Sequence, residues 1–229
     1  MKKTTLLILI FITLSCSTSK KRIQYGKITF MKYDIITEES AKKSNKNFGM
    51  ALGVMASEMD SIERKEFLKS DAHNVMMVEP KNDSILLEAF IYPKCFWDAF
   101  YDGKVVYGKG IYTNRDSLYQ CSKRKDNLDT PCTRKTDVIY KNESKYKIEY
   151  FPNDKKEILG YNCFKILATR LDSTHTLEIY ATKDIILNYN PILKFKSLNN
   201  KYYVLEYSRI FSHDKGNILK YKAVSIDLD

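Results

Sequence analysis

The sequence predicts a mainly β (α+β) fold, in which an antiparallel meander sheet carries one amphipathic helix. Three observations predict it. Seventeen Tyr and 11 Phe, with many Ile and Val, favour strands. Short alternating runs recur about every 10 residues with turn signals between them, as in antiparallel meanders. One segment, residues 47–69, instead has the 3.6-residue period of a helix.

The first strand is expected at residues 23–33, where Ile23, Tyr25 and Lys27 share one face and Gln24 and Ile28 the other. Turn residues such as Asp102-Gly103 and Asn199-Asn200 separate the later runs. Those runs are residues 74–78, 84–91, 104–112, 117–121, 137–140, 145–151, 162–169, 174–181, 192–196, 202–211 and 217–226.

The predicted helix at residues 47–69 follows the first strand. Its apolar stripe consists of Phe48, Leu52, Met55, Met59 and Ile62, spaced i, i+4, i+7, i+11 and i+14. We expect the helix to pack across one face of the sheet, with the stripe lining an apolar groove.

The methionines of this region allow two interpretations. Thioethers could form a copper site, whereas methionine also fills cores and lines adaptable apolar grooves. The second interpretation is the favoured one, and we predict no metal site. The methionines concerned are Met50, Met55, Met59, Met76 and Met77.

The N-terminus has the pattern of a secretory signal. Lys2 and Lys3 precede an apolar run at residues 6–14. That run is shorter than the roughly 20 residues that a membrane-spanning helix needs. We therefore expect export rather than a transmembrane segment.

Cys16 follows this run and resembles the cysteine of a bacterial lipoprotein cleavage box, although Thr13 stands where Leu is usual. We expect residues 1–15 to be a lipoprotein signal peptide, with acyl chains on Cys16. Residues 16–22 would then be a tether, since two or more chains anchor a protein stably. The alternative is an ordinary cleaved signal with an incidental cysteine.

The remaining chain suits one β-rich domain, residues 23–229. Removing residues 1–15 from the 229 leaves 214 residues and lowers the formal charge from +10 to +8, because Lys2 and Lys3 are lost. This length can bury a real core. The basic residues are scattered, which favours a solvated surface beside an anionic membrane over a nucleic-acid partner.

The residues after Cys16 predict the membrane location. Position 17 is Ser rather than Asp, which favours the outer membrane, and no acidic run follows Cys16, which favours the periplasmic side of that membrane.

A short motif carries a resemblance to a known family. Residues 158–165 contain an Ile-x-Gly-Tyr-x-Cys-x-Lys pattern, followed by an aromatic strand and the turn Asp184-Ile185. This order resembles the GLPGLI family of exported bacterial proteins. The family's naming stretch is missing, since residues 190–208 contain no glycine. The chain therefore resembles a divergent relative. The motif residues are Ile158, Gly160, Tyr161, Cys163 and Lys165.

The resemblance implies a β-rich exported domain similar to the open half-barrels that carry lipoproteins or lipids. It implies no catalytic activity, because the family has no settled one.

Cys163 has three interpretations: packing, a disulfide or catalysis. A nucleophilic cysteine needs a base nearby in space, and the three histidines, His73, His175 and His213, all lie in polar, turn-like contexts. His175 is one hairpin away, so a Cys–His pair stays open. Packing as a small apolar group is favoured because cysteines among strand residues are commonly buried.

Four cysteines remain after Cys16, an even number in an oxidising compartment. Cys121 and Cys132 flank a charged loop, and a disulfide between them would close it. Cys95 and Cys163 are then left over. The spacing of these cysteines does not fit a zinc site.

Three classes of function remain. The first is a membrane-tethered binding module for an apolar ligand or another envelope protein, and it is the favoured one. The alternatives are a thiol-dependent hydrolase and a purely structural envelope protein. We expect no cofactor and no catalytic residues, because the sequence has no Gly-rich phosphate loop, serine nucleophile elbow or acidic metal cluster.

Overall fold

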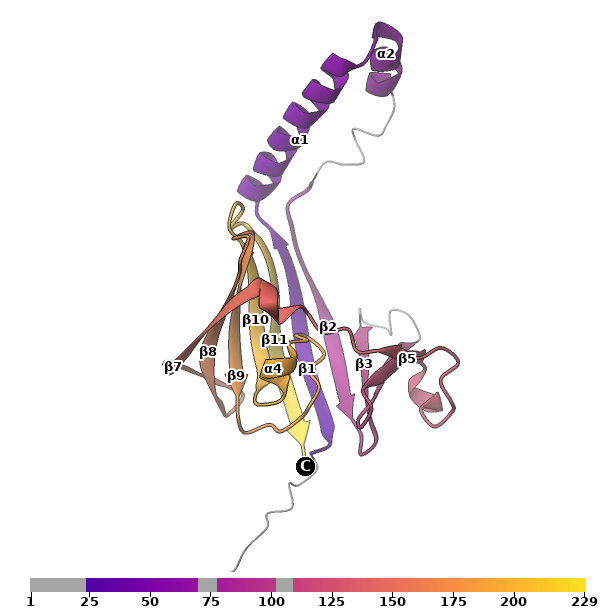
Figure 1. The fold of residues 1–229 in the computed structure, drawn as a ribbon, viewed down its shortest axis with the longest axis vertical. Coiled ribbons are helices and arrows are strands. Elements are labelled where there is room, and N and C mark those ends of the chain that lie inside the picture. Colours follow the sequence, from indigo (N-terminus) through magenta and orange to yellow (C-terminus); the bar gives the residue numbers. More distant parts are fainter. Residues whose placement is uncertain (1–23, 70–77, 102–108) are drawn as a thin grey trace, which may run out of the picture.

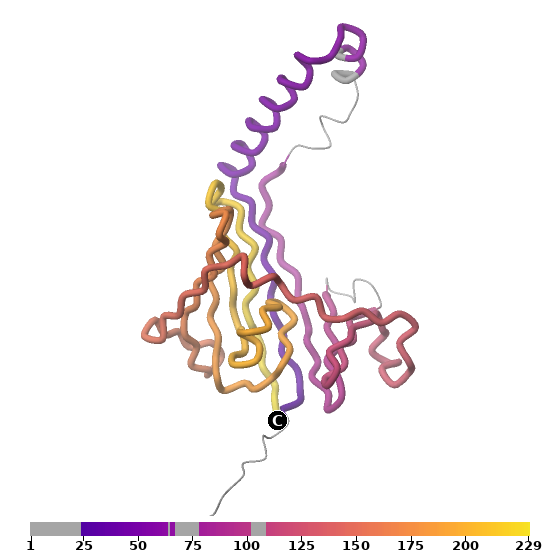
Figure 2. The backbone as a smooth tube through the Cα atoms, viewed as in Figure 1, coloured from indigo at the N-terminus to yellow at the C-terminus, as the bar shows by residue number. Residues whose placement is uncertain are grey.

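A computed structural model of the chain describes residues 24–69, 78–101 and 109–229. These residues form an 11-stranded sheet with the strand order β6-β5-β4-β3-β2-β1-β11-β10-β9-β8-β7 (Figures 1 and 2). The sheet is antiparallel throughout, and it is not closed because β6 and β7 are its edges. The mainly β fold class is therefore confirmed.

The bounds of the elements are as follows. The strands are β1 (Gly26–Ile36), β2 (Lys81–Ile91), β3 (Cys95–Tyr101), β4 (Gly110–Asn114), β5 (Tyr119–Lys123), β6 (Thr136–Asp137), β7 (Tyr146–Ile158), β8 (Tyr161–Arg170), β9 (His175–Thr182), β10 (Tyr203–Phe211) and β11 (Asn217–Leu228). The described helices are α1 (Glu38–Glu58), α2 (Ser61–Lys69) and α4 (Lys196–Asn199), with 3₁₀ turns η1 (Lys125–Asn127) and η2 (Glu143–Lys145).

One face of the sheet, here called the inner face, is covered by the chain itself. The connection between β9 and β10, residues 183–202, lies across this face and is called the inner segment (Figure 1). Its buried side chains join the main core together with strand residues such as Phe30 and Ile166. They are Ile185, Leu187, Tyr189, Ile192, Leu193, Phe195 and Leu198.

Asn190 holds the inner segment in place. Its side chain accepts hydrogen bonds from the backbone N–H groups of Ile192 and Leu193, both at 3.1 Å, and donates one to the carbonyl of Val204 at 2.9 Å. A buried amide that satisfies several backbone groups fixes an irregular segment in one conformation. The strand predicted at residues 192–196 is therefore wrong, because this stretch belongs to the inner segment.

A second connection joins the two edges of the sheet. Residues 138–145, here called the strap, run from β6 to β7 across the inner segment (Figure 2). The backbone N–H of Lys141 donates to the carbonyl of Lys194 at 2.9 Å. Part of the inner face is thus covered by two irregular segments of the chain.

The sequence missed β3. Its sequence, CFWDAFY, has no alternation of apolar and polar residues, because Phe96 packs in the main core while Cys95 and Trp97 pack in a second cluster on the other face. A strand buried on both faces reads as a continuous apolar run. The expected strands at residues 74–78 and 104–112 lie largely outside the described residues.

The predicted helix exists, but its bounds and its packing were wrong. Thr37 caps α1 by accepting from the backbone N–H of Ser40 at 3.2 Å, so the helix begins at Glu38 rather than at residue 47. The chain breaks at Asp60, whose carboxylate caps α2. The two helices project from one end of the sheet as an arm, α1 and α2 (Figure 1), instead of lying across a sheet face.

Candidate functional site

The strongest candidate site is a cavity between the inner segment and residues of β2, β3, β4, β5 and β11. Its volume is about 500 Å³, within the range of small-molecule sites, which are mostly apolar with a few polar groups. It is lined by Leu87, Asp98, Ala99, Phe100, Lys109, Gly110, Ile111, Ser122, Tyr189, Pro191, Lys194 and Tyr221.

Asp98 is the unusual member of this lining. It is buried in the middle of β3, opposite Ala89 on one side and Ile111 on the other. The hydroxyl of Tyr189 donates to Oδ2 at 2.6 Å, while Oδ1 has no hydrogen-bond partner. Burial raises the pKa of Asp98 to about 7, against the lowering effect of the Tyr189 hydrogen bond.

Tyr189 links the inner segment to the sheet. Besides its bond to Asp98, its hydroxyl accepts a hydrogen bond from Nε2 of Gln120 at 3.3 Å, and the same nitrogen donates to Oγ1 of Thr113 at 2.9 Å. These polar groups come from β3, β4, β5 and the inner segment, and all are buried. The network fixes the position of Asp98 and the cavity wall together.

Lys194 completes the polar part of the site. Its ammonium lies 5.6 Å from the ring centre of Tyr189. Burial lowers the pKa of Lys194, and the charge of Asp98 opposes that lowering. A carboxyl and an amine whose pKa values shift towards each other in a cavity are typical of functional sites.

The lining contains no histidine and no cysteine. It offers an apolar wall, an unpartnered carboxyl oxygen and an ammonium group. No group of histidine, cysteine, aspartate or glutamate side chains suited to a metal was found among the residues that the structure describes.

The family-motif residues take structural positions. Leu159 and Gly160, with φ of 52° and 83°, form the two-residue turn between β7 and β8, where positive φ favours glycine. Lys165 pairs with Glu178 at 2.9 Å. Tyr161 is the first residue of β8 and packs against the main core. This part of the motif therefore builds a hairpin.

Cys163 is a free, buried cysteine that is 1 % exposed. Burial raises the pKa of its thiol to about 12, with Asp184 and Glu206 adding to the effect. Its neighbour Phe164 pairs with Ala181, six positions along β9 from His175. At about 3.3 Å per residue, the cysteine and the histidine are about 20 Å apart. The Cys163–His175 pair left open by the sequence does not form.

The other cysteines differ in their bonding. Cys121 and Cys132 form a disulfide that closes the charged loop, which is the pairing considered from the sequence. Cys95 is free and buried in the cluster around Trp97. Cys16 lies outside the described residues.

The predicted groove-lining residues lie on the arm and line no groove against the sheet. Met55 and Ile62 are 50 % and 70 % exposed, and Phe48, Leu52 and Met59 are partly buried. Apart from Ser40 and Ala41, no described residue of α1 is buried. The arm therefore presents its apolar residues instead of burying them in the sheet.

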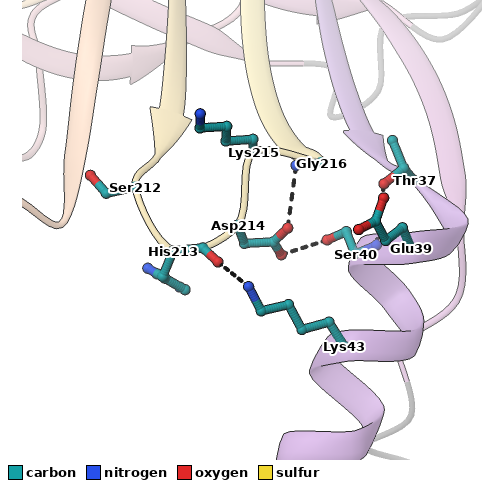
Figure 3. Close-up of a pocket in the computed structure, with 9 residues that line it drawn as sticks. All are labelled: Thr37, Glu39, Ser40, Lys43, Ser212, His213, Asp214, Lys215 and Gly216. Carbon is teal, nitrogen blue, oxygen red and sulfur yellow. Dashed lines mark hydrogen bonds between the residues drawn. The ribbon is translucent and has the colours of Figure 1, made fainter.

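A polar pocket of about 310 Å³ lies where the arm joins the sheet (Figure 3). Its groups are occupied with one another: Ser40 donates to the carboxylate of Asp214, and Lys43 donates to the carbonyl of His213. Gly216 lies so close to Thr37 that a side chain there would collide with it. This pocket attaches α1 to the turn between β10 and β11, so it is a structural joint.

Sequence reasoning missed the cavity because its parts are far apart in the chain. One signal was readable. Asp98 is the lone charged residue in the apolar stretch CFWDAFY, and a buried carboxyl is rare unless it is paired or functional. Tyr189 and Lys194 had no such signal, because the inner segment reads as a loop.

Comparisons with known proteins do not name a family. No family model matches the chain, and no curated protein matches it. The solved structure of PNGF-II aligns with 89 % of this chain and 28 % of its own at 13 % identity, with a TM-score of 0.43. A DUF1329 family protein from Desulfovibrio piger aligns with 91 % of this chain and 86 % of its own at 8 % identity, with a TM-score of 0.26. Scores this low support no functional inference, and the GLPGLI resemblance stays a prediction.

Proposed function

We propose that the protein is a binding module of the cell envelope and that the cavity beside Asp98 takes a small amphipathic ligand. The observation that carries the proposal is a mainly apolar cavity with a buried, unpartnered carboxyl oxygen at Asp98. An unpaired buried polar atom costs free energy. A ligand donor group that pairs with it would recover that cost.

The ligand would have an apolar body and a polar group. Leu87, Phe100 and Ile111 supply the apolar contacts, and Asp98 with Lys194 supplies hydrogen bonds. The module would act without catalysis, tethered through Cys16 to the outer membrane on its periplasmic side. Among the described residues, no helix is long and apolar enough to cross a membrane.

Energy transfer from Trp97 tests this proposal. Trp97 is the only tryptophan of the chain and neighbours Asp98 in β3. The apolar fluorophore N-phenyl-1-naphthylamine should quench its emission in a saturable way. The substitution Ile111→Ser removes part of the cavity wall and should weaken binding by several-fold, because contact with this half-exposed side chain would contribute only part of the about 1.5–3 kcal/mol of complete burial.

The matched control is Val224→Ser. Val224 is 39 % exposed and Ile111 is 44 % exposed, but Val224 lies on β11 outside the cavity lining. Binding that is equally weakened by both substitutions would place the fluorophore elsewhere. Absence of saturable quenching in the unsubstituted protein would remove the proposal.

The arm supports a second candidate, a site for another envelope protein. Met50, Val54, Met55 and Ile62 are all at least half exposed on α1 and α2, and exposed apolar groups mark interaction surfaces. Crosslinking from position 55 in intact cells would test it. A crosslinked partner that disappears with Val54→Glu, whose side chain is 60 % exposed beside the crosslinking position, would support this function, and no crosslink would leave the cavity as the site.

A further inference from the structure

A second group of residues on the inner face carries positive charge that is not neutralised. Arg209 lies on β10, opposite Leu177 of β9 and Leu219 of β11. Its Nε is buried and has no hydrogen-bond partner. Tyr207, two positions earlier and so on the same face, is buried against the core and stacks on Tyr221 at 5.2 Å. Arg209 therefore faces inward.

The strap carries a second cation, Lys141, on the inner side of the sheet. Lys141 is partly buried, and burial lowers the pKa of its ammonium, with the positive charge of Arg209 adding to the effect. Its ammonium lies 5.8 Å from the ring centre of Phe195. None of the ion pairs formed within the described part of the chain includes Arg209 or Lys141.

A chain of ring contacts connects the two cations. Phe195 contacts Tyr146 at 5.1 Å, and Tyr146 contacts His175 at 5.7 Å. His175 in turn contacts Phe211 at 5.9 Å, and the Arg209 guanidinium lies 5.1 Å from that ring. The contacts therefore run in sequence from one cation to the other.

A hydrogen-bonded pair, Tyr146 and His175, lies within this chain of contacts. The Tyr146 hydroxyl and Nε2 of His175 are 3.1 Å apart, so the two share a hydrogen bond. Burial lowers the pKa of His175, and Arg209, Arg170 and Lys141 lower it further. The one acidic group that acts on the histidine is Asp172, and it is already paired with Arg170 at 2.8 Å.

We propose that Arg209 and Lys141, backed by His175 and Tyr146, form a binding site for an oxyanion, the carboxylate or phosphate group of a small molecule. A guanidinium offers the planar fork that these anions prefer. The charge of Arg209 acts on Lys141 and disfavours its charged form, and an anion bound by both side chains would offset that effect. Both side chains are partly exposed, so an anion can reach them from solvent.

The site is separate from the Asp98 cavity, although Tyr221 lines that cavity and Arg209 is its diagonal neighbour on the sheet. The inference does not depend on the proposed function. An anion could bind here whether or not the cavity holds a ligand.

The test is an NMR titration of the His175 ring with two probes, inorganic phosphate and octanoate, at constant ionic strength. We expect a saturable shift with at least one of them in the millimolar range or below. Phosphate alone would indicate a phosphate source, octanoate alone a carboxylate with an apolar tail, and both a general oxyanion site. No saturable shift with either probe would overturn the inference.

Two substitutions and a control locate the site. Arg209→Gln and Lys141→Gln should each weaken binding by about tenfold. Lys147→Gln removes the same charge from a side chain that is 67 % exposed on β7 and should leave binding unchanged. Unchanged binding in both site variants, or equal weakening by the control, would overturn the proposal. If Arg209→Gln does not fold, Lys141→Gln on the strap decides alone.

Quenching of Trp97 by N-phenyl-1-naphthylamine, measured on the same variants, separates this inference from the proposed function. Loss of phosphate and octanoate binding with normal quenching would concern the oxyanion site only. Normal oxyanion binding without quenching of Trp97 would support this inference and overturn the proposal that the cavity binds a ligand.

Discussion

Asp98 shows at the scale of a single residue how burial changes chemistry. It is the only charged residue of β3, and it has one hydrogen bond for two oxygens. Taking a carboxylate out of water favours its neutral form. The folded protein therefore holds this proton to about pH 7, whereas the unfolded chain releases it near its ordinary pKa of about 3.9.

This difference predicts a pH dependence of stability. Between about pH 4 and pH 7 the unfolded chain binds fewer protons, so the free energy of unfolding falls as pH rises, by about 1.4 kcal/mol per unit. The contribution is complete below about pH 4 and is lost as pH rises through about 7. Asp98→Asn cannot ionise, so its loss of stability between about pH 5 and pH 8 should be smaller by about 2–3 kcal/mol.

Urea unfolding at the two pH values measures the Asp98 effect. Asp83→Asn, which changes an exposed carboxyl on the neighbouring strand β2, is the control and should behave like the unsubstituted protein. An Asp98→Asn variant that loses as much stability as the unsubstituted protein would show that the carboxyl is not held neutral.

Cys163 gives a second prediction at the residue scale. Its thiol is buried and keeps its proton, because burial raises its pKa to about 12, and only the thiolate reacts with alkylating agents. Iodoacetamide should therefore leave Cys163 unmodified in the native protein and modify it after unfolding in urea. Peptide mass mapping gives the result, and rapid modification without urea would show that the thiol is accessible.

At the scale of elements, some features follow from the local sequence and others depend on tertiary packing. The β7–β8 turn follows from local chemistry, because Gly160 adopts the positive φ that the two-residue turn needs. The start of α1 follows from the Thr37 cap. The arm's position does not follow from its own sequence, because its amphipathic pattern fits packing on the sheet as well as exposure.

The disulfide is a prediction at this scale. Cys121 lies in β5 and Cys132 is 11 residues further along the chain, so their disulfide closes the loop between them. Replacing both with serine should lower the free energy of unfolding by about 2–3 kcal/mol through the entropy of the open loop in the unfolded chain. Urea unfolding of the double variant checks this, with reduction of the unsubstituted protein as a parallel measurement. A double variant as stable as the unreduced, unsubstituted protein would mean that the disulfide hardly constrains the unfolded chain.

The inner segment decides the character of the whole molecule. An open half-barrel that carries lipids needs an empty apolar face, and here residues 183–202 fill most of that face. What is left beside Asp98 is a cavity of about 500 Å³. The irregular segment is thus as much a part of the core as the strands are.

Substitution of Leu193 tests this view. Leu193 is 0 % exposed in the inner segment, so Leu193→Ala should lower the free energy of unfolding by about 2–5 kcal/mol. Met55→Ala on the arm, where the side chain is 50 % exposed, should change it by less than about 0.5 kcal/mol. Urea unfolding compares the two. Similar small effects would mean that the inner segment is a dispensable cover.

The sequence by itself determined the mainly β class, the approximate positions of most strands along the chain and the presence of a helix after the first strand. It did so because alternation and helical period are local properties. It also indicated the pairing of Cys121 with Cys132. Strand β3 was not predicted, because its burial on both faces removes the alternation of apolar and polar residues.

Only the tertiary structure decided where the groups of the two proposed sites meet. Asp98 and Tyr189 are 91 positions apart and Lys141 and Arg209 are 68 apart, from the residue numbers alone. Their meeting depends on how the inner segment and the strap cross the sheet. No local sequence pattern predicts such a crossing. It depends on packing, because the buried side chains of an irregular segment must fit the apolar face of strands that are distant in the sequence.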